Sequence, residues 1–383
     1  MTKAAAKAMA TLRHIAAAGL PAGMVFNDVA RCLAEIAPFQ SATLVLYDDD
    51  LRPTDALVTH DICPEVSNRY FQRWFNRDEA RFMPSHAGAA RGGAPDVFKV
   101  SDYNPRLWET ELYDEVFREL GFARMASMML REGGKAVGNI AFGRAVGGPD
   151  YSEADLKAFE SAAAYAALAL SRRAAEPGLF ESADLEEVET GVVTTNREGE
   201  VLQLSHNASR LLRQASMAYY SPAAVLERWR TRGPAAEADA WAWARPLLAE
   251  LAARVGAGLA GRPGAPAIVR RASPHGEFVL KAYAMEAQAA GRRDDTVVVQ
   301  ISRRTPLQAR LFASALFRSL TPQEQVVCRR LLEGMGQPQI AAQLGLSPHT
   351  VVSHVRNLYR RTGANSRETL QAAVLNGGAL ALR

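Results

Sequence analysis

The sequence predicts an α+β multidomain fold, in which two antiparallel-sheet domains precede an all-α domain of four helices. Apolar and polar residues alternate with the period of a strand in two separate regions, at 42–47, 125–130 and 136–142 and again at 277–285 and 295–301. Beyond residue 306 the apolar residues recur at helical spacing instead. A chain of 383 residues is long enough for two or three domains, each with its own core.

The first domain is expected to span residues 1–175. Gly133 and Gly134 mark a turn between two of its strands, which predicts an antiparallel hairpin. Helix-start signals at 150–153 precede a long amphipathic stretch that ends near Leu170. The block LREGGKAVGNIAFGRAVGGPDYSEADLKAFESAAAYAALAL resembles the final hairpin and closing helix of a GAF domain. The resemblance implies a sensory role without naming the stimulus.

The second domain is expected to span residues 176–305. Two short strands around a turn at 197–199 are followed by a helix through Leu211 and Leu212. The return strands are the pair at 277–285 and 295–301, and the basic, proline-ended segment 302–306 is interpreted as a junction. The stretch ETGVVTTNREGEVLQLSHNASRLL and the paired return strands are similar to a PAS domain, which also implies sensing.

The all-α domain, residues 306–383, contains two helices joined by a tight turn. A short helix is expected at 337–344, and Gly345 supplies the turn after it. Ser347 as a cap and Pro348 at the first helical position start the next helix, which runs to about Arg361. This order predicts a helix-turn-helix.

The second of these helices has a polar, cationic outer face. Val351, Val355 and Leu358 fall at helical spacing and are expected in the core. The residues left outward are Val352, Ser353, Arg356, Asn357 and Arg360. From Leu320 onward seven arginines and three glutamates leave a net charge of +4, equal to that of the whole chain. A basic domain with a helix narrow enough for the major groove favours binding to double-stranded DNA.

The C-terminal segment closely resembles the DNA-binding domain of LuxR-type regulators. The resemblance rests on LTPQE, the Glu333-Gly334 pair, QIAAQLGLSPHTVVSHV and NSRETL. It implies that base contacts come from Val352, Ser353 and Arg356, although many relatives carry lysine at the position of Val352. It also implies that a fourth helix, capped by Ser366, contributes to a homodimer interface.

Side-chain chemistry separates base contacts from phosphate contacts. The planar guanidinium of Arg356 matches the two acceptors of a guanine edge. Phosphate contacts, which fix register without reading sequence, are expected from four residues: Thr350, Asn357, Arg360 and Arg361.

The predicted function is a cytoplasmic, sequence-specific transcriptional regulator, controlled by a small molecule or a partner through its sensor domains. Its partners would be promoter DNA, RNA polymerase and a second copy of the chain. We expect no enzymatic activity, no cofactor, no metal and no membrane span, because catalytic motifs and long apolar runs are missing from the sequence. Cys32, Cys63 and Cys328 form no CxxC pair, which favours a reducing compartment.

The effector and two other functions stay open. Four aromatic residues of the first domain are candidates for a ligand pocket, with core packing as the alternative use: Tyr70, Trp74, Tyr103 and Trp108. An acyl-homoserine-lactone site is disfavoured because Asp78 is followed by Glu79 rather than proline, and His60 with Cys63 supplies too few ligands for a metal. The alternative functions are a sigma-factor-like subunit of RNA polymerase and a sensory scaffold whose terminal helices mediate assembly.

Overall fold

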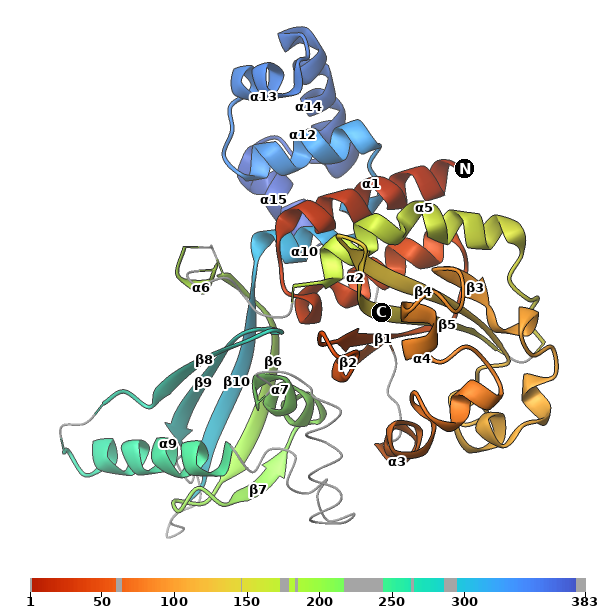
Figure 1. Cartoon of the computed structure of the whole chain (residues 1–383). Helices are drawn as coiled ribbons and strands as arrows, with labels where there is room; N and C mark the ends of the chain where they lie inside the picture. The colour runs from red at the N-terminus through yellow and green to blue at the C-terminus, as the bar shows by residue number, and fades with distance from the viewer. Residues whose placement is uncertain are drawn as a thin grey trace.

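The computed structural model describes residues 2–59, 64–145, 147–172, 179–182, 185–216, 244–262, 265–285 and 295–376. Within these residues the chain forms two five-stranded antiparallel sheets and a C-terminal helical region (Figure 1). His60, Cys63 and the turn expected around Gly291 lie outside the described residues. Among the described helices, none combines the length and the apolar character that a membrane crossing requires.

The first sheet has the strand order β2-β1-β5-β4-β3. Its strands are β1 (Ser41–Tyr47), β2 (Pro53–Val58), β3 (Val97–Lys99), β4 (Arg124–Glu132) and β5 (Lys135–Arg144). The predicted hairpin is confirmed: β4 pairs with β5, and Gly133 and Gly134 between them both have positive φ, 57° and 83°. Two residues with positive φ form a type I′ turn, whose twist suits paired strands.

Alternation along the strands divides the first domain into two cores. In β1, Leu44 and Leu46 point into a core with the helices that cover one face of the sheet, whereas Val45 and Tyr47 point to the other face. The covering helices are α1 (Lys3–Ala18), α2 (Ala22–Ile36) and α5 (Glu153–Leu170). The predicted long helix is therefore α5, and Ser152 caps it through a capping box with Asp155.

The opposite face of the first sheet is covered by short helices and irregular segments between residues 64 and 122. These helical segments are α3 (Pro64–Arg69), Tyr70–Trp74, Asp78–Arg81, α4 (His86–Ala90), Val100–Asp102, Leu107–Glu109 and Tyr113–Phe117. Short segments of this kind pack less regularly than three long helices, and this side of the sheet contains the cavity described below.

The second sheet has the order β7-β6-β10-β9-β8. Its strands are β6 (Leu185–Thr195), β7 (Val201–Leu204), β8 (Ile268–Ser273), β9 (Gly276–Ala284) and β10 (Val297–Pro306). One face packs on α7 (His206–Ser216) and α9 (Ala244–Leu259), while α6 (Leu179–Ser182) precedes the sheet. The strand pair around the turn, the following helix and the paired return strands are confirmed. β6 is longer than expected, with 11 residues, and β8 is an addition to the prediction.

The interpretation of residues 302–306 as a junction is wrong. These residues continue β10, and Thr305 and Pro306 pair with Glu186 and Leu185 of β6. Ser302 and Thr305 are buried, so their polar character does not mark an exposed linker.

The C-terminal region contains the four predicted helices and two short ones before them. In order they are α10 (Leu307–Ala313), α11 (Ala315–Ser319), α12 (Pro322–Leu332), α13 (Gln337–Leu344), α14 (Pro348–Thr362) and α15 (Arg367–Asn376). Pro306 ends β10 and precedes α10 directly, so the strand of the second sheet leads into the helical region without a spacer.

The helical region lies on α1, as Figure 1 shows. Phe317 and Leu320 are fully buried in the same apolar cluster as the three helices of the first domain. Beside them Lys7 donates to the carbonyl of Ser319. The C-terminal helices and the first domain therefore share one core rather than two separate ones.

Candidate nucleic-acid interface

Local capping signals set the positions of α12, α13 and α14. Thr321 and Glu324 form a capping box that starts α12. Gly345 ends α13 with φ of 62°, a conformation that glycine adopts without steric cost. The hydroxyl of Ser347 then accepts from the backbone N–H of Thr350 at 3.1 Å and starts α14.

The inner face of α14 is apolar and the outer face is not. Val351, Val355 and Leu358 are buried against neighbouring helices, as the helical spacing predicted. Val352, which follows Val351 in the chain, is 38% exposed although it is apolar. Ser353 and Arg356 follow it on the exposed face. An exposed valine beside a serine and an arginine suits contact with a methyl group and polar base edges.

The residues predicted to contact bases differ in how strongly they are already bound. Ser353 donates to the carbonyl of His349 at 2.9 Å, within its own helix. Arg356 makes no side-chain hydrogen bond or ion pair in the described part of the chain, so all five of its N–H donors stay available to a ligand.

The residues predicted to contact phosphates fall into two groups. The Thr350 hydroxyl lies 2.8 Å from that of Ser347, and Arg360 donates to the side-chain oxygen of Asn357 at 3.1 Å on the exposed face. Arg361 points inward instead, donating to Glu324 at 2.6 Å and to the carbonyl of Ser319 at 3.2 Å. It therefore has fewer donors left for a phosphate than Arg360.

Ion pairs concentrate the uncompensated charge of the domain on α14. Arg329 and Arg330 both bind Glu333, at 2.7 and 2.8 Å. Burial alone would raise the pKa of Glu333, but hydrogen bonds from the two arginines outweigh burial and lower it. The pKa of Glu324 is lowered as well: burial opposes ionisation, and hydrogen bonds from Thr321 with the charge of Arg361 overcome it.

The result is an exposed helix face with two arginines, Arg356 and Arg360, that no acidic side chain of the described residues neutralises. A helix of this width and charge fits a major groove and attracts phosphates. α13, the turn at Gly345 and α14 are thus a helix-turn-helix of the DNA-binding class.

The helix-turn-helix and the helices around it match a known family of DNA-binding domains. Residues 318–374 match the family model described as "Bacterial regulatory proteins, luxR family", and they form a LuxR-type DNA-binding domain. The chain is 38% identical over 73 residues to the transcriptional regulatory protein UhpA of Escherichia coli K12, which covers 19% of this chain and 37% of that protein.

Two further similarities are shorter or more remote. A nitrate/nitrite response regulator protein homolog of Haemophilus influenzae is 47% identical over 49 residues, which covers 13% of this chain and 24% of the relative. The chain therefore spans well under half the length of both curated relatives. A solved structure of the Vibrio cholerae VqmA dimer is 16% identical, with coverage of 52% of this chain and 85% of that chain and a TM-score of 0.15.

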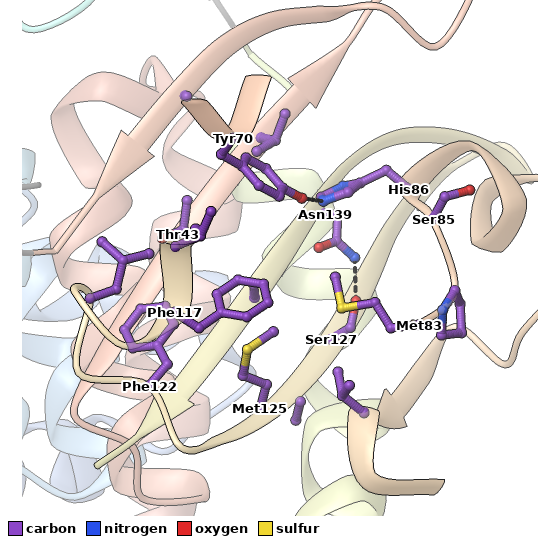
Figure 2. Close-up of a pocket in the computed structure, with 18 of the residues that line it drawn as sticks. Thr43, Tyr70, Met83, Ser85, His86, Phe117, Phe122, Met125, Ser127 and Asn139 are labelled. Atoms are coloured by element: carbon purple, nitrogen blue, oxygen red, sulfur yellow. Dashed lines mark hydrogen bonds between the residues drawn. The ribbon is translucent and has the colours of Figure 1, made fainter. Parts of the chain in front are cut away.

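The aromatic residues predicted to form a ligand pocket do not gather at one place. Tyr70 lines a cavity between the first sheet and the short helices that cover one of its faces (Figure 2). Trp74 is fully buried in the core, where its indole N–H donates to Glu115 at 3.1 Å. Tyr103 and Trp108 are 44% and 40% exposed and lie outside that cavity. The spacing of apolar residues could not distinguish core packing from lining a cavity, because Trp74 and Tyr70 occur at the same helical spacing in both cases.

Three polar residues of the cavity were not predicted from the sequence: His86, Ser127 and Asn139. Asn139 is the one with a signal in the sequence, since it is an amide in the apolar middle of strand β5 and points to the same face as Ala141. Among the described residues no cluster of three or more His, Cys, Asp or Glu side chains has the arrangement that a metal ion requires.

Proposed function

We propose that the chain is a cytoplasmic transcriptional regulator that binds promoter DNA as a homodimer, acts on RNA polymerase and responds to a small molecule. It acts by binding rather than by catalysis. The observation that carries the proposal is the outer face of α14, where Arg356 and Arg360 stay uncompensated while the other described arginines of helices α12–α15 are held within the domain.

On this proposal Val352, Ser353 and Arg356 read base edges in the major groove. Thr350, Asn357 and Arg360 contact phosphates on either side and fix the register of the helix. Arg361 contributes less to DNA and more to the fold, because its guanidinium bridges Glu324 and the carbonyl of Ser319.

The N-terminal domains act as GAF-like and PAS-like sensors in this scheme. Two physical links support coupling to DNA. α1 packs on the DNA-binding domain while it also covers the first sheet. Strand β10 of the second sheet continues into α10. A ligand that favours one arrangement of these elements would shift the population of DNA-competent dimers.

The test is a selection of duplexes from a random library by the full chain, followed by binding titrations at several salt concentrations. We expect enrichment of a defined site and an affinity that falls with salt, because phosphate contacts release counterions. The Arg356→Ala chain should lose discrimination at one base pair. Absence of enrichment together with salt-independent binding would contradict the proposal.

A further inference from the structure

The first domain contains a cavity between its sheet and the short helices of residues 64–122 (Figure 2). Its volume is about 100 Å³. The sheet contributes Thr43, Met125 and Asn139, and the opposite side contributes the rings of Phe117 and Phe122. Most of the lining is apolar, so the cavity offers a ligand chiefly dispersion contacts and release from water.

Besides the single hydroxyls of Thr43, Ser67 and Ser85, polar groups form two clusters on the wall. On the sheet, the side-chain amide of Asn139 donates to the hydroxyl of Ser127 at 2.7 Å. An amide has a second N–H and a carbonyl oxygen, so Asn139 keeps hydrogen-bonding capacity beyond that contact. Both residues come from adjacent central strands, β5 and β4, which gives the pair a rigid position.

The second polar place is a buried chain of hydrogen bonds. Tyr70 donates to Glu79 at 2.7 Å and lies 3.0 Å from Nε2 of His86, whose Nδ1 contacts the hydroxyl of Tyr47. Since the Tyr70 hydrogen is directed to Glu79, Nε2 must donate to Tyr70, and Nδ1 must accept from Tyr47. Glu79 also accepts the backbone N–H of Asn76 at 2.8 Å. The side chains of this hydrogen-bonded network therefore already serve as donors and acceptors for one another.

No formal charge faces the cavity from the residues that the structure describes around it, since they include no Lys, Arg, Asp or Glu. Burial lowers the pKa of His86, and burial followed by the nearby Glu79 raises the pKa of Tyr70. Both side chains are therefore neutral near pH 7. A charged ligand would lose its hydration here without gaining a counter-charge.

We propose that this cavity takes a compact, uncharged molecule with an apolar ring-sized body and one hydrogen-bonding group that binds Asn139. This inference rests on the proposed function, because it gives the chemical class of the small molecule to which the regulator responds. A dry cavity of about 150 Å³ accommodates benzene. The cavity here has about two-thirds of that volume, so a ligand of roughly six or seven non-hydrogen atoms fits once the lining side chains shift slightly. Long acyl chains and carboxylates are excluded by volume and by desolvation.

The experiment titrates the full chain by calorimetry with three single-ring probes: toluene and phenol, which are equal in size, and benzoate, which is two atoms larger and carries a charge. We expect toluene and phenol to bind, phenol more tightly, and benzoate to bind at least tenfold more weakly than phenol. Asn139→Leu keeps the volume but removes the amide, and should weaken phenol roughly three- to tenfold while leaving toluene nearly unchanged.

Two controls separate loss of the site from loss of the fold. Ala141→Phe fills the cavity from the sheet side and should abolish binding of toluene and phenol without unfolding the chain, as circular dichroism would show. Ser161→Ala, at an exposed position of α5, should leave all three affinities unchanged. Binding of benzoate equal to that of phenol, equal loss of both neutral probes in Asn139→Leu, or no binding of either neutral probe would overturn the inference.

Failure of the proposed function has a different signature. DNA affinity is measured on the same samples, with and without saturating phenol. A chain that binds the neutral probes but no duplex keeps the ligand inference and loses the proposed function. A chain that binds a selected duplex but neither neutral probe keeps the DNA-binding proposal and loses the inference.

Discussion

The hydroxyl of Thr11 lies 3.2 Å from the side-chain oxygen of Gln325, across 314 positions of sequence, and joins α1 to α12. Both residues are fully buried. The amide nitrogen of Gln325 also reaches the carbonyls of Arg318 and Leu320, each at 3.4 Å. A buried polar pair inside an apolar contact fixes one relative position of the two surfaces, because any displacement leaves a polar group without its partner.

We predict that Thr11→Val lowers the free energy of unfolding by about 1 to 2 kcal/mol, because the side-chain oxygen of Gln325 then loses its donor in a buried place. Urea unfolding of the full chain measures the change. The double variant with Gln325→Leu should lose less than the sum of the two single variants, since neither polar partner remains. Strict additivity would show that the contact carries no coupling.

A second prediction concerns the contact between α2 and the second sheet, where Nδ1 of His275 lies 3.3 Å from the carbonyl of Gly23. A Cβ atom at Gly23 would meet His275 and the Pro274 carbonyl at 2.9 Å. Gly23→Ala should therefore lower the melting temperature, despite the gain in helix propensity of about 1 kcal/mol.

The matched control for this substitution is Gly256→Ala in α9, where nothing lies within 4 Å of the added methyl group. It should raise the melting temperature by a few degrees, because propensity acts alone. Equal stabilisation by both alanines would show that α2 and the second sheet do not pack closely in solution.

For DNA recognition, we predict that Arg356→Ala reduces affinity for the selected duplex by about 1 to 3 kcal/mol and relaxes preference at one base pair. Arg356→Lys should recover part of the affinity but little of the preference, because an ammonium lacks the planar fork. Fluorescence anisotropy on the selected duplex and on single-base variants measures both. An unchanged preference would remove Arg356 from the base-reading residues.

Adjacent arginines should behave differently. Arg360→Ala should weaken binding to all duplexes similarly and reduce the salt slope by about one, as expected for one lost phosphate contact. Arg361→Ala should instead lower domain stability by about 1 to 2 kcal/mol, because Glu324 loses its ion-pair partner at 2.6 Å while Arg361 itself is one-third exposed. Opposite outcomes for the two variants would exchange their roles.

Stability should fall in mild acid. Burial is the main cause that lowers the pKa of His14 and of His275 to about 4, and the charges of Arg329 and Arg303 respectively add to it. Between pH 6.5 and about 4 the unfolded chain binds protons that the folded chain does not, so the stability present above pH 6.5 is lost as the pH falls.

Urea unfolding at pH 7.5 and pH 5 tests this dependence on pH. The contribution is roughly 1 to 3 kcal/mol for each histidine. His14→Gln and His275→Gln should each reduce the difference between the two pH values, whereas His349→Gln, at an exposed position of α14, should leave it unchanged. Equal pH dependence in all four proteins would show that neither buried histidine controls it.

Local signals predicted the helix-turn-helix and the paired strands. Ser347, Pro348 and Gly345 determine where α14 begins because caps and turns act over a few residues. β8 carries no such local signal, because most of its side chains are exposed and show no apolar alternation. The contact of Thr11 with Gln325 has no local signal either, because it forms only when distant segments pack.

The candidate site was predictable to a similar degree. Burial of Val351, Val355 and Leu358 follows from spacing, so the outward position of Arg356 follows as well. The pairing of Arg361 with Glu324 requires the angle between two helices, which spacing does not give. The cavity depends on gaps between imperfectly packed short helices, and residue type alone does not distinguish a gap from a filled core.

β10 leads directly into α10 at Pro306, and this connection determines how much of a displacement of the second sheet is transmitted to the helical region. A flexible linker of ten residues has an end-to-end distance of roughly 15 to 20 Å that varies freely, so the helical region would not follow a small displacement of the strand. A single proline, with φ held at −59°, leaves almost no such freedom. A displacement of β10 along its axis would therefore move the start of α10 by nearly the same distance.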